Sequence, residues 1–291
     1  MKIVRARLLG FCMGVKRAVE SAEAALEENA RGSSTVFTLG PLIHNDAVLR
    51  SLKERGAEIL DASSAEKAGN GDTVIIRAHG TTPEVASRLA ESGAKVIDAT
   101  CPRVHQSQKR AAEWAKKGFA VIIAGDRNHG EVASICGYAE GRAVVIETAA
   151  EAEQISIPEK SILIAQTTFS PSEFEQISRV LCRRNPGIQV FNSICPATSK
   201  RQDALRELEG TADGILVIGG KNSANTRRLF ETAANICGKA ALIETAEDIP
   251  GEFLAMETVG ITAGASTPGF LIDEAESFLR ENSQSAENKV R

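Results

Sequence analysis

Three cysteines occupy the same place in a pattern that occurs three times along the chain. Cys12, Cys101 and Cys195 each follow a strand-like run and precede an amphipathic helical segment. A proline follows the second and the third of them, at a position that suits the first turn of a helix. One isolated cysteine is ordinarily a small buried apolar residue. Packing does not require a cysteine at one place in three copies, so the repeat favours ligands of a metal centre.

These three sulfurs define the chemistry of the predicted centre. Each lies where a helix begins, and the helix dipole favours negative charge there. Three converging thiolates require a positive centre, and a zinc ion with an open position is one option, which keeps a zinc hydrolase among the candidates. An iron–sulfur cluster is favoured, because it accepts thiolates from distant segments and three ligands leave one iron open as a Lewis acid. Cys136, Cys182 and Cys237 have no repeated position and are interpreted as packing residues.

Polar residues recur after two other strand-like runs of each copy. The first set of loops carries His44, then His129 with Glu131, then Ser223 with Asn225, and the second set carries His79, then Thr167 with Thr168, then Ser266. Histidines and neutral donors suit an anionic ligand such as a phosphate. Glu131 is the carboxylate of these loops and the natural proton donor. Ser223 and Ser266 are equally compatible with helix caps, and Glu131 with a favourable charge in a first helical turn.

The order of the segments predicts the fold that brings these loops together. Strands alternate with helices, which is typical of parallel sheets whose ligands bind at the carboxyl ends of the strands. We expect an α/β fold of three similar units in a pseudo-threefold arrangement around a central iron–sulfur cluster. The predicted units are 13–100, 101–194 and 195–280. Residues 1–12 supply the last strand of the third unit, and 281–291 form a polar tail that frays.

Composition excludes several classes of function. The net charge of −4 and an aromatic content of 4% argue against nucleic-acid binding, and hence against a cluster-based sensor that acts through DNA or RNA. The chain has no apolar run that approaches the roughly 18 residues of a membrane helix, so we expect no membrane partner and a cytoplasmic location. No glycine-rich dinucleotide or P-loop motif follows a strand.

The sequence resembles the 4-hydroxy-3-methylbut-2-enyl diphosphate reductases of the non-mevalonate isoprenoid pathway. The resemblance covers residues 1–280 and is carried by the motifs GFCMGV, GPLIHN, RAHG, DATCP, GDRNHGEV, QTT, ICPATSKRQ, KNSAN and TAGAS. It implies a [4Fe–4S] cluster held by Cys12, Cys101 and Cys195. It also implies substrate-binding residues and catalytic ones, the latter being Glu131, Thr167 and His129. The implied substrate-binding residues are His44, His79, His129, Thr167, Thr168, Ser223, Asn225 and Ser266. Of these, His44, His79, Ser223, Asn225 and Ser266 are the implied ligands of the diphosphate, with His129 also in the pocket.

The implied reaction is a reductive dehydroxylation of an allylic diphosphate. Two electrons and two protons remove the hydroxyl as water and yield isopentenyl and dimethylallyl diphosphate, with ferredoxin or flavodoxin as the electron donor. A hydro-lyase, which eliminates water without net electrons, is the runner-up, and dependence on an external reductant separates the two. One departure is visible, because the family often has a serine where this chain has Ala224.

Overall fold

Three parallel four-stranded sheets organise the chain. The computed structural model describes residues 1–30 and 34–290. In sheet order, the first consists of β3 (Ala57–Leu60), β2 (Val36–Leu39), β4 (Thr73–Ile76) and β5 (Lys95–Asp98). The second consists of β7 (Ala143–Ile146), β6 (Ala120–Ala124), β8 (Ser161–Ala165) and β9 (Gln189–Phe191). The third consists of β1 (Lys2–Arg5), β12 (Thr258–Ala263), β10 (Gly214–Ile218) and β11 (Ala240–Ile243).

The three sheets share one strand order. Numbered within its own repeat, each sheet runs second, first, third, fourth strand. In the third sheet the fourth place is taken by β1, which pairs in parallel with β12 so that Ile3 lies opposite Val259. The expected α/β fold with three similar sheets is confirmed, as is the pairing of the N-terminal strand with the last third of the chain.

By its contacts the chain divides into two compact units. One comprises Met1–Met13, His44–Val48 and Pro196–Arg291 and contains the third sheet. The other comprises Gly14–Ile43 and Leu49–Cys195 and contains the first and second sheets. The finer boundaries expected at residues 101 and 195 stay a prediction.

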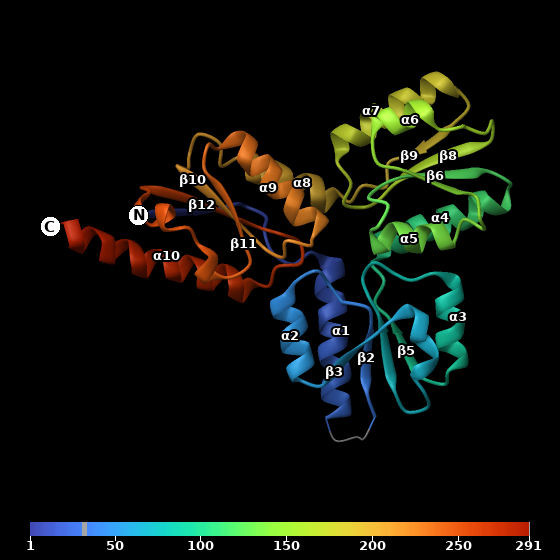
Figure 1. The fold of residues 1–291 in the computed structure, drawn as a ribbon, viewed down its shortest axis with the longest axis horizontal. Coiled ribbons are helices and arrows are strands. Elements are labelled where there is room, and N and C mark those ends of the chain that lie inside the picture. Colours follow the sequence, from blue (N-terminus) through green and yellow to red (C-terminus); the bar gives the residue numbers. More distant parts are fainter. Residues whose placement is uncertain (31–33, 291) are drawn as a thin grey trace. The chain divides into compact units, whose positions relative to one another are not determined.

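Helices connect successive strands and cover the sheets (Figure 1). In the two-sheet unit these are α1 (Met13–Asn29), α2 (Asp46–Glu54), the 3₁₀ segment η1 (Ala62–Lys67), α3 (Pro83–Glu91), α4 (Pro102–Lys116), α5 (Gly130–Gly137), α6 (Ala149–Gln154) and α7 (Pro171–Arg184), of which α1 and α2 begin in the other unit. The one-sheet unit has α8 (Pro196–Arg206), α9 (Ala224–Ile236), the 3₁₀ segments η2 (Ala246–Asp248) and η3 (Gly251–Ala255), and α10 (Gly269–Val290).

Alternate strand residues build separate cores on the two faces of a sheet. In the second sheet, Ile122 and Leu163 pack with residues of α6 and α7. Their neighbours Ile123 and Ile162 pack with residues of α4 and α5 on the other face. Consecutive side chains of a strand point to opposite faces, so strands covered on both faces are apolar throughout. This explains runs such as AVIIA and SILIA.

The C-terminal helix is longer than the sequence analysis predicts. A helix ending near residue 280 with a frayed tail was expected, but α10 continues to Val290. Residues 281–290 contain neither glycine nor proline. Extending an existing helix costs far less than starting one, so polar residues without a breaker continue it. Within the described ranges, no helix combines the length and the apolar character needed to cross a membrane.

Candidate active site

The predicted site residues lie at the carboxyl ends of the strands of each sheet, where the connections after neighbouring strands leave in opposite directions. In each sheet the first and third strands of the repeat are neighbours, and the chain leaves them in opposite directions, which is the point where open α/β sheets bind ligands. The loops after these strands carry His44 and His79 in the first sheet, His129 and Thr167 in the second, and Ser223 and Ser266 in the third. Each of the three cysteines follows the fourth strand.

One backbone contact fixes each of these cysteines in the same way. The N–H of Cys101 donates to the carbonyl of Ala78 (2.9 Å), and that of Cys195 donates to Thr167 (2.7 Å). In the other unit, the N–H of Cys12 donates to Ala265 (3.0 Å). Each acceptor lies in the loop after the third strand of the same repeat, beside or at a predicted site residue. The cysteine and the polar loop of every repeat are therefore held together.

The sulfur of Cys101 also explains a glycine of the first motif. A Cβ placed on Gly14 would lie 2.7 Å from this sulfur, so only glycine allows the helix to approach it. All six cysteines lie in the described ranges, and none forms a disulfide there. Cys136 lies within α5, away from any strand end, and burial raises the pKa of its thiol.

A buried carboxylate forms the centre of the second sheet's loops. Glu131 is 1% exposed. The Thr167 N–H donates to its Oε1 (2.6 Å), and the Thr167 hydroxyl donates to its Oε2 (2.8 Å). The carbonyl of the same threonine accepts from Cys195. One residue thus links the predicted proton donor to a predicted cluster ligand.

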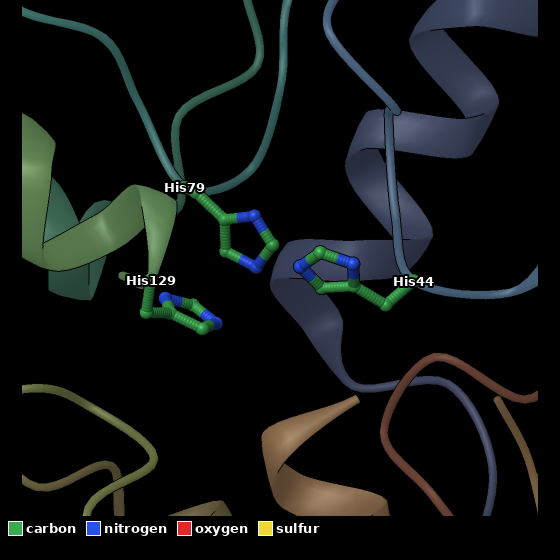
Figure 2. A group of neighbouring side chains, drawn as sticks. All are labelled: His44, His79 and His129. Carbon is green, nitrogen blue, oxygen red and sulfur yellow. The ribbon is translucent and has the colours of Figure 1, made fainter. Parts of the chain in front are cut away.

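Two histidines of this unit lie against each other. The His79 and His129 rings meet edge to face, with centroids 4.8 Å apart and planes inclined by 74° (Figure 2). His129 is also the N-cap of α5, because its Nδ1 accepts from the Glu131 N–H (3.2 Å). An accepting Nδ1 carries no proton, so the neutral ring has its proton on Nε2.

Thr168 lies next to Thr167 and has a different contact. Its hydroxyl accepts from Gln166 Nε2 (3.0 Å), while the other end of that amide accepts from the N–H of Asp126 (2.8 Å). Thr168 therefore helps to hold two loops of the second sheet together, and its predicted contact with substrate stays a prediction.

The one-sheet unit presents hydroxyl and amide groups. Ser223 accepts from the Thr226 N–H (3.4 Å) as the N-cap of α9, and the hydroxyl of Ser266 donates to the carbonyl of His44 (3.1 Å). Asn225 lies in the first turn of α9 and is 4% exposed. Its Nδ2 has no hydrogen-bond partner among the residues that the structure describes. A buried donor left in this state costs free energy, which indicates a ligand that would accept from it.

Sequence reasoning missed a polar network that supports the His79 loop. Gln108 of α4 donates to the Ser134 hydroxyl (2.6 Å), which donates to the carbonyl of Thr81 (3.0 Å). Both side chains are buried. The sequence could have indicated this network, because Gln108 and Ser134 stand at positions of the helical repeat where an apolar residue is expected on the buried face. Sequence reasoning also left out Arg77, a partly buried arginine two residues before His79.

The chain is similar to one family along nearly its whole length. The sequence profile of the LytB protein family matches residues 3–280. A 4-hydroxy-3-methylbut-2-enyl diphosphate reductase of Treponema denticola is 48% identical over 289 residues, covering 97% of this chain and 100% of that protein. The enzyme of the same name from Aquifex aeolicus is 39% identical and covers 96% of each chain.

Solved structures give the same result for the fold. The E-1-hydroxy-2-methyl-but-2-enyl-4-diphosphate reductase of Plasmodium falciparum superposes with a TM-score of 0.86 at 27% identity, covering 96% of this chain and 87% of that one. A second structure, titled as the terminal enzyme of the non-mevalonate pathway, has a TM-score of 0.71 at 38% identity. It covers 97% of this chain and all of its own.

Proposed function

Since the chain belongs to the LytB family, we propose that it is an oxidoreductase that removes the hydroxyl group of 4-hydroxy-3-methylbut-2-enyl diphosphate. The substrate takes up two electrons and two protons and loses water. The products are isopentenyl and dimethylallyl diphosphate. A relative that carries this name covers 97% of the chain, and the predicted motifs lie at the edges where open α/β sheets bind ligands.

The observation that carries this proposal is the double role of Thr167. Its N–H and hydroxyl hold the Glu131 carboxylate, and its carbonyl holds the backbone of Cys195. The two donors fix the position of this buried carboxyl group, so a proton that it carries is delivered in a fixed direction. The hydrogen bond to Cys195 keeps that acid beside the chain segment proposed to bind the redox centre.

The three cysteines fit an iron–sulfur cluster. The three residues are partly exposed, and each directly precedes a helix. Thiolates are the ligands that such clusters require. Gly14, whose missing side chain makes room for the Cys101 sulfur, is two residues from Cys12 in the chain. Iron–sulfur centres are a known feature of this family. We propose a [4Fe–4S] cluster with these three ligands, which supplies electrons and an open Lewis-acid position when bound.

The remaining residues bind and orient the substrate in this proposal. His44, His79, His129, Ser223, Asn225 and Ser266 hold the diphosphate, and Thr168 lies in the adjoining loop. Asn225 has a buried N–H donor that an anionic oxygen would satisfy. Glu131 holds the proton at its carboxyl group, and Thr167 orients it. Ferredoxin or flavodoxin as the donor and a cytoplasmic location remain predictions of the sequence.

The test begins with iron and acid-labile sulfide in anaerobically purified protein. The visible spectrum of the wild type is compared with those of Cys12→Ser, Cys101→Ser and Cys195→Ser. Cys182→Ser is the control, because that residue is exposed on α7. We expect a brown protein whose cluster is lost or destabilised in the three variants and is kept in the control.

Turnover is then measured with the allylic diphosphate and an external reductant. We expect both products to form only when the reductant is present. Consumption of substrate without it would indicate an elimination of water instead. A colourless protein that holds zinc, even after anaerobic reconstitution, would overturn the redox assignment.

A further inference from the structure

Arg77 places a guanidinium group among the loops of the candidate site. It follows β4 directly and precedes His79 by two residues. A Cβ on Gly40 would lie 3.0 Å from its Nη1, and a Cβ on Gly130 would overlap its Nη2. Gly40 follows β2, the neighbour of β4, and Gly130 separates His129 from Glu131. Two glycines thus leave room for this group beside the residues proposed to act on substrate.

The charge of this guanidinium is not compensated by the protein. Arg77 is partly buried, and its side chain makes no hydrogen bond or ion pair with any residue in the ranges 1–30 and 34–290. Burial lowers the pKa of Arg77, and no carboxylate nearby offsets that effect. Glu131, in the adjoining turn, already accepts from Thr167 through both oxygens. Withdrawing an unpaired charge from water is costly, so this arrangement indicates an anionic partner that arrives with the ligand.

The helix that begins at Gly130 strengthens this conclusion. The N-terminus of α5 carries a partial positive charge. A guanidinium against this end is unfavourable when the space between them is empty of anions. An anion placed there is stabilised by both groups. His129 directly precedes Gly130, and its ring lies against that of His79 (Figure 2).

We propose that Arg77 is a substrate-binding residue whose guanidinium binds the diphosphate of the allylic substrate. The identity of the anion rests on the function proposed above. The planar fork of arginine matches two phosphate oxygens at once, which a lysine does not reproduce. Arg77 supplies permanent positive charge, in contrast to His79 and His129, whose charge depends on protonation. The site then keeps its affinity for a polyanion even while both imidazoles are neutral.

The experiment measures binding of inorganic diphosphate to the cluster-loaded protein by calorimetry, together with KM and kcat for the allylic diphosphate. Arg77→Gln is expected to weaken diphosphate binding about 10- to 100-fold, as for the loss of charge-assisted hydrogen bonds. Arg77→Lys is expected to weaken it about 3- to 10-fold. KM should rise in parallel while kcat changes less than about threefold, because the contact is made equally in the ground and transition states. Arg127→Gln is the control, since that arginine is exposed and paired with Glu147 and Glu151.

A purely structural role for Arg77 gives a different result. Diphosphate binding within about twofold of wild type in folded, cluster-loaded Arg77→Gln or Arg77→Lys would overturn the proposal, even when thermal stability falls. Should Arg77→Gln fail to hold its cluster, the lysine variant alone decides. Wild-type protein that binds inorganic diphosphate in an Arg77-dependent way but does not reduce the allylic substrate would refute the proposed function and leave the anion site in place.

Discussion

Two buried side chains, one in each unit, are prepared in opposite ways. In the two-sheet unit, Glu131 is buried and both of its oxygens are bonded to Thr167. In the one-sheet unit, Asn225 is almost equally buried, yet its amide donor has no partner among the described residues. A satisfied acid keeps one position and delivers a proton in one direction. An unsatisfied donor is held ready for an oxygen that the protein does not supply. We interpret the first side chain as prepared for proton transfer and the second as prepared for an anionic ligand.

The largest expected effect comes from the acid itself. Glu131→Gln keeps the shape of the side chain and still accepts from the Thr167 N–H, but it cannot donate a proton as a carboxylic acid does. We expect kcat to fall about 10²- to 10⁴-fold, with KM and the iron content near those of wild type. Steady-state kinetics and metal analysis measure this, with Glu175→Gln on the exposed part of α7 as control. Near-normal turnover would remove Glu131 from the mechanism.

The unpartnered amide of Asn225 predicts that its removal keeps or raises the stability of the protein but weakens substrate binding. Asn225→Ala removes a buried donor that has no partner in the free protein. Its free energy of unfolding should therefore be unchanged or higher by about 1 kcal/mol. KM for the allylic diphosphate should rise about 10-fold or more. Urea denaturation and kinetics measure the two effects.

The matched control for this change is Asn235→Ala, because Asn235 lies exposed on the same helix. It should alter neither KM nor stability beyond the ordinary helix propensities. A clear loss of stability in Asn225→Ala, without a change in KM, would show that Asn225 is a structural residue and that it does not differ from Glu131 as described.

Variants of Thr167 test whether the orientation of the Glu131 carboxyl group, and not only its presence, contributes to kcat. Thr167→Val removes the hydroxyl that donates to Glu131 Oε2 but leaves the backbone N–H and the hydrogen bond to Cys195. We expect kcat to fall about 10-fold, as for one hydrogen bond worth about 1.4 kcal/mol. Thr167→Ser restores the hydroxyl and should stay within about threefold of wild type. Equal kcat values for the valine and serine variants would contradict an orienting role.

The smallest effect separates two roles of Ser223. As the N-cap of α9 it contributes about 1 kcal/mol, which Ser223→Ala should remove and Ser223→Gly should largely keep. As a ligand of the diphosphate it lowers KM, and both variants lack the hydroxyl. We therefore expect a few-fold rise of KM in both and a loss of stability in the alanine variant alone. A KM that follows stability rather than the hydroxyl would leave Ser223 as a cap only.

Much of this site was predictable because its residues recur in phase with the fold. The cysteines at 12, 101 and 195 share a place in the repeat, and so do the loops with His79, Thr167 and Ser266. A threefold repeat makes such positions recognisable in the sequence, because the same residue type rarely stands at three equivalent places by chance. The pairing of β1 with β12 followed from the same counting, because the last repeat lacked a fourth strand.

Other features were not predictable, because they depend on contacts between distant segments. Nothing in the sequence predicts that α10 reaches Val290, since the charge and polarity of the tail are equally typical of frayed ends. Whether the charge of Arg77 is compensated depends on which carboxylates lie near it in the fold, and these come from distant segments. In the sequence, RAHG is only a short motif that ends a strand.

The sequence by itself determined the composition of the candidate site: three thiols, three histidines in loops, the carboxyl group of Glu131 and a set of hydroxyl and amide donors, each placed after a strand. Periodic patterns carry that information, because strands and helices have fixed repeats. Only the tertiary structure decided which donors are satisfied. The hydrogen bonds of Thr167 to Glu131 and Cys195, the unpaired amide of Asn225 and the isolated guanidinium of Arg77 all depend on distances across the fold. Hydrogen bonds and charges act over a few ångströms, and only folding sets distances on that scale.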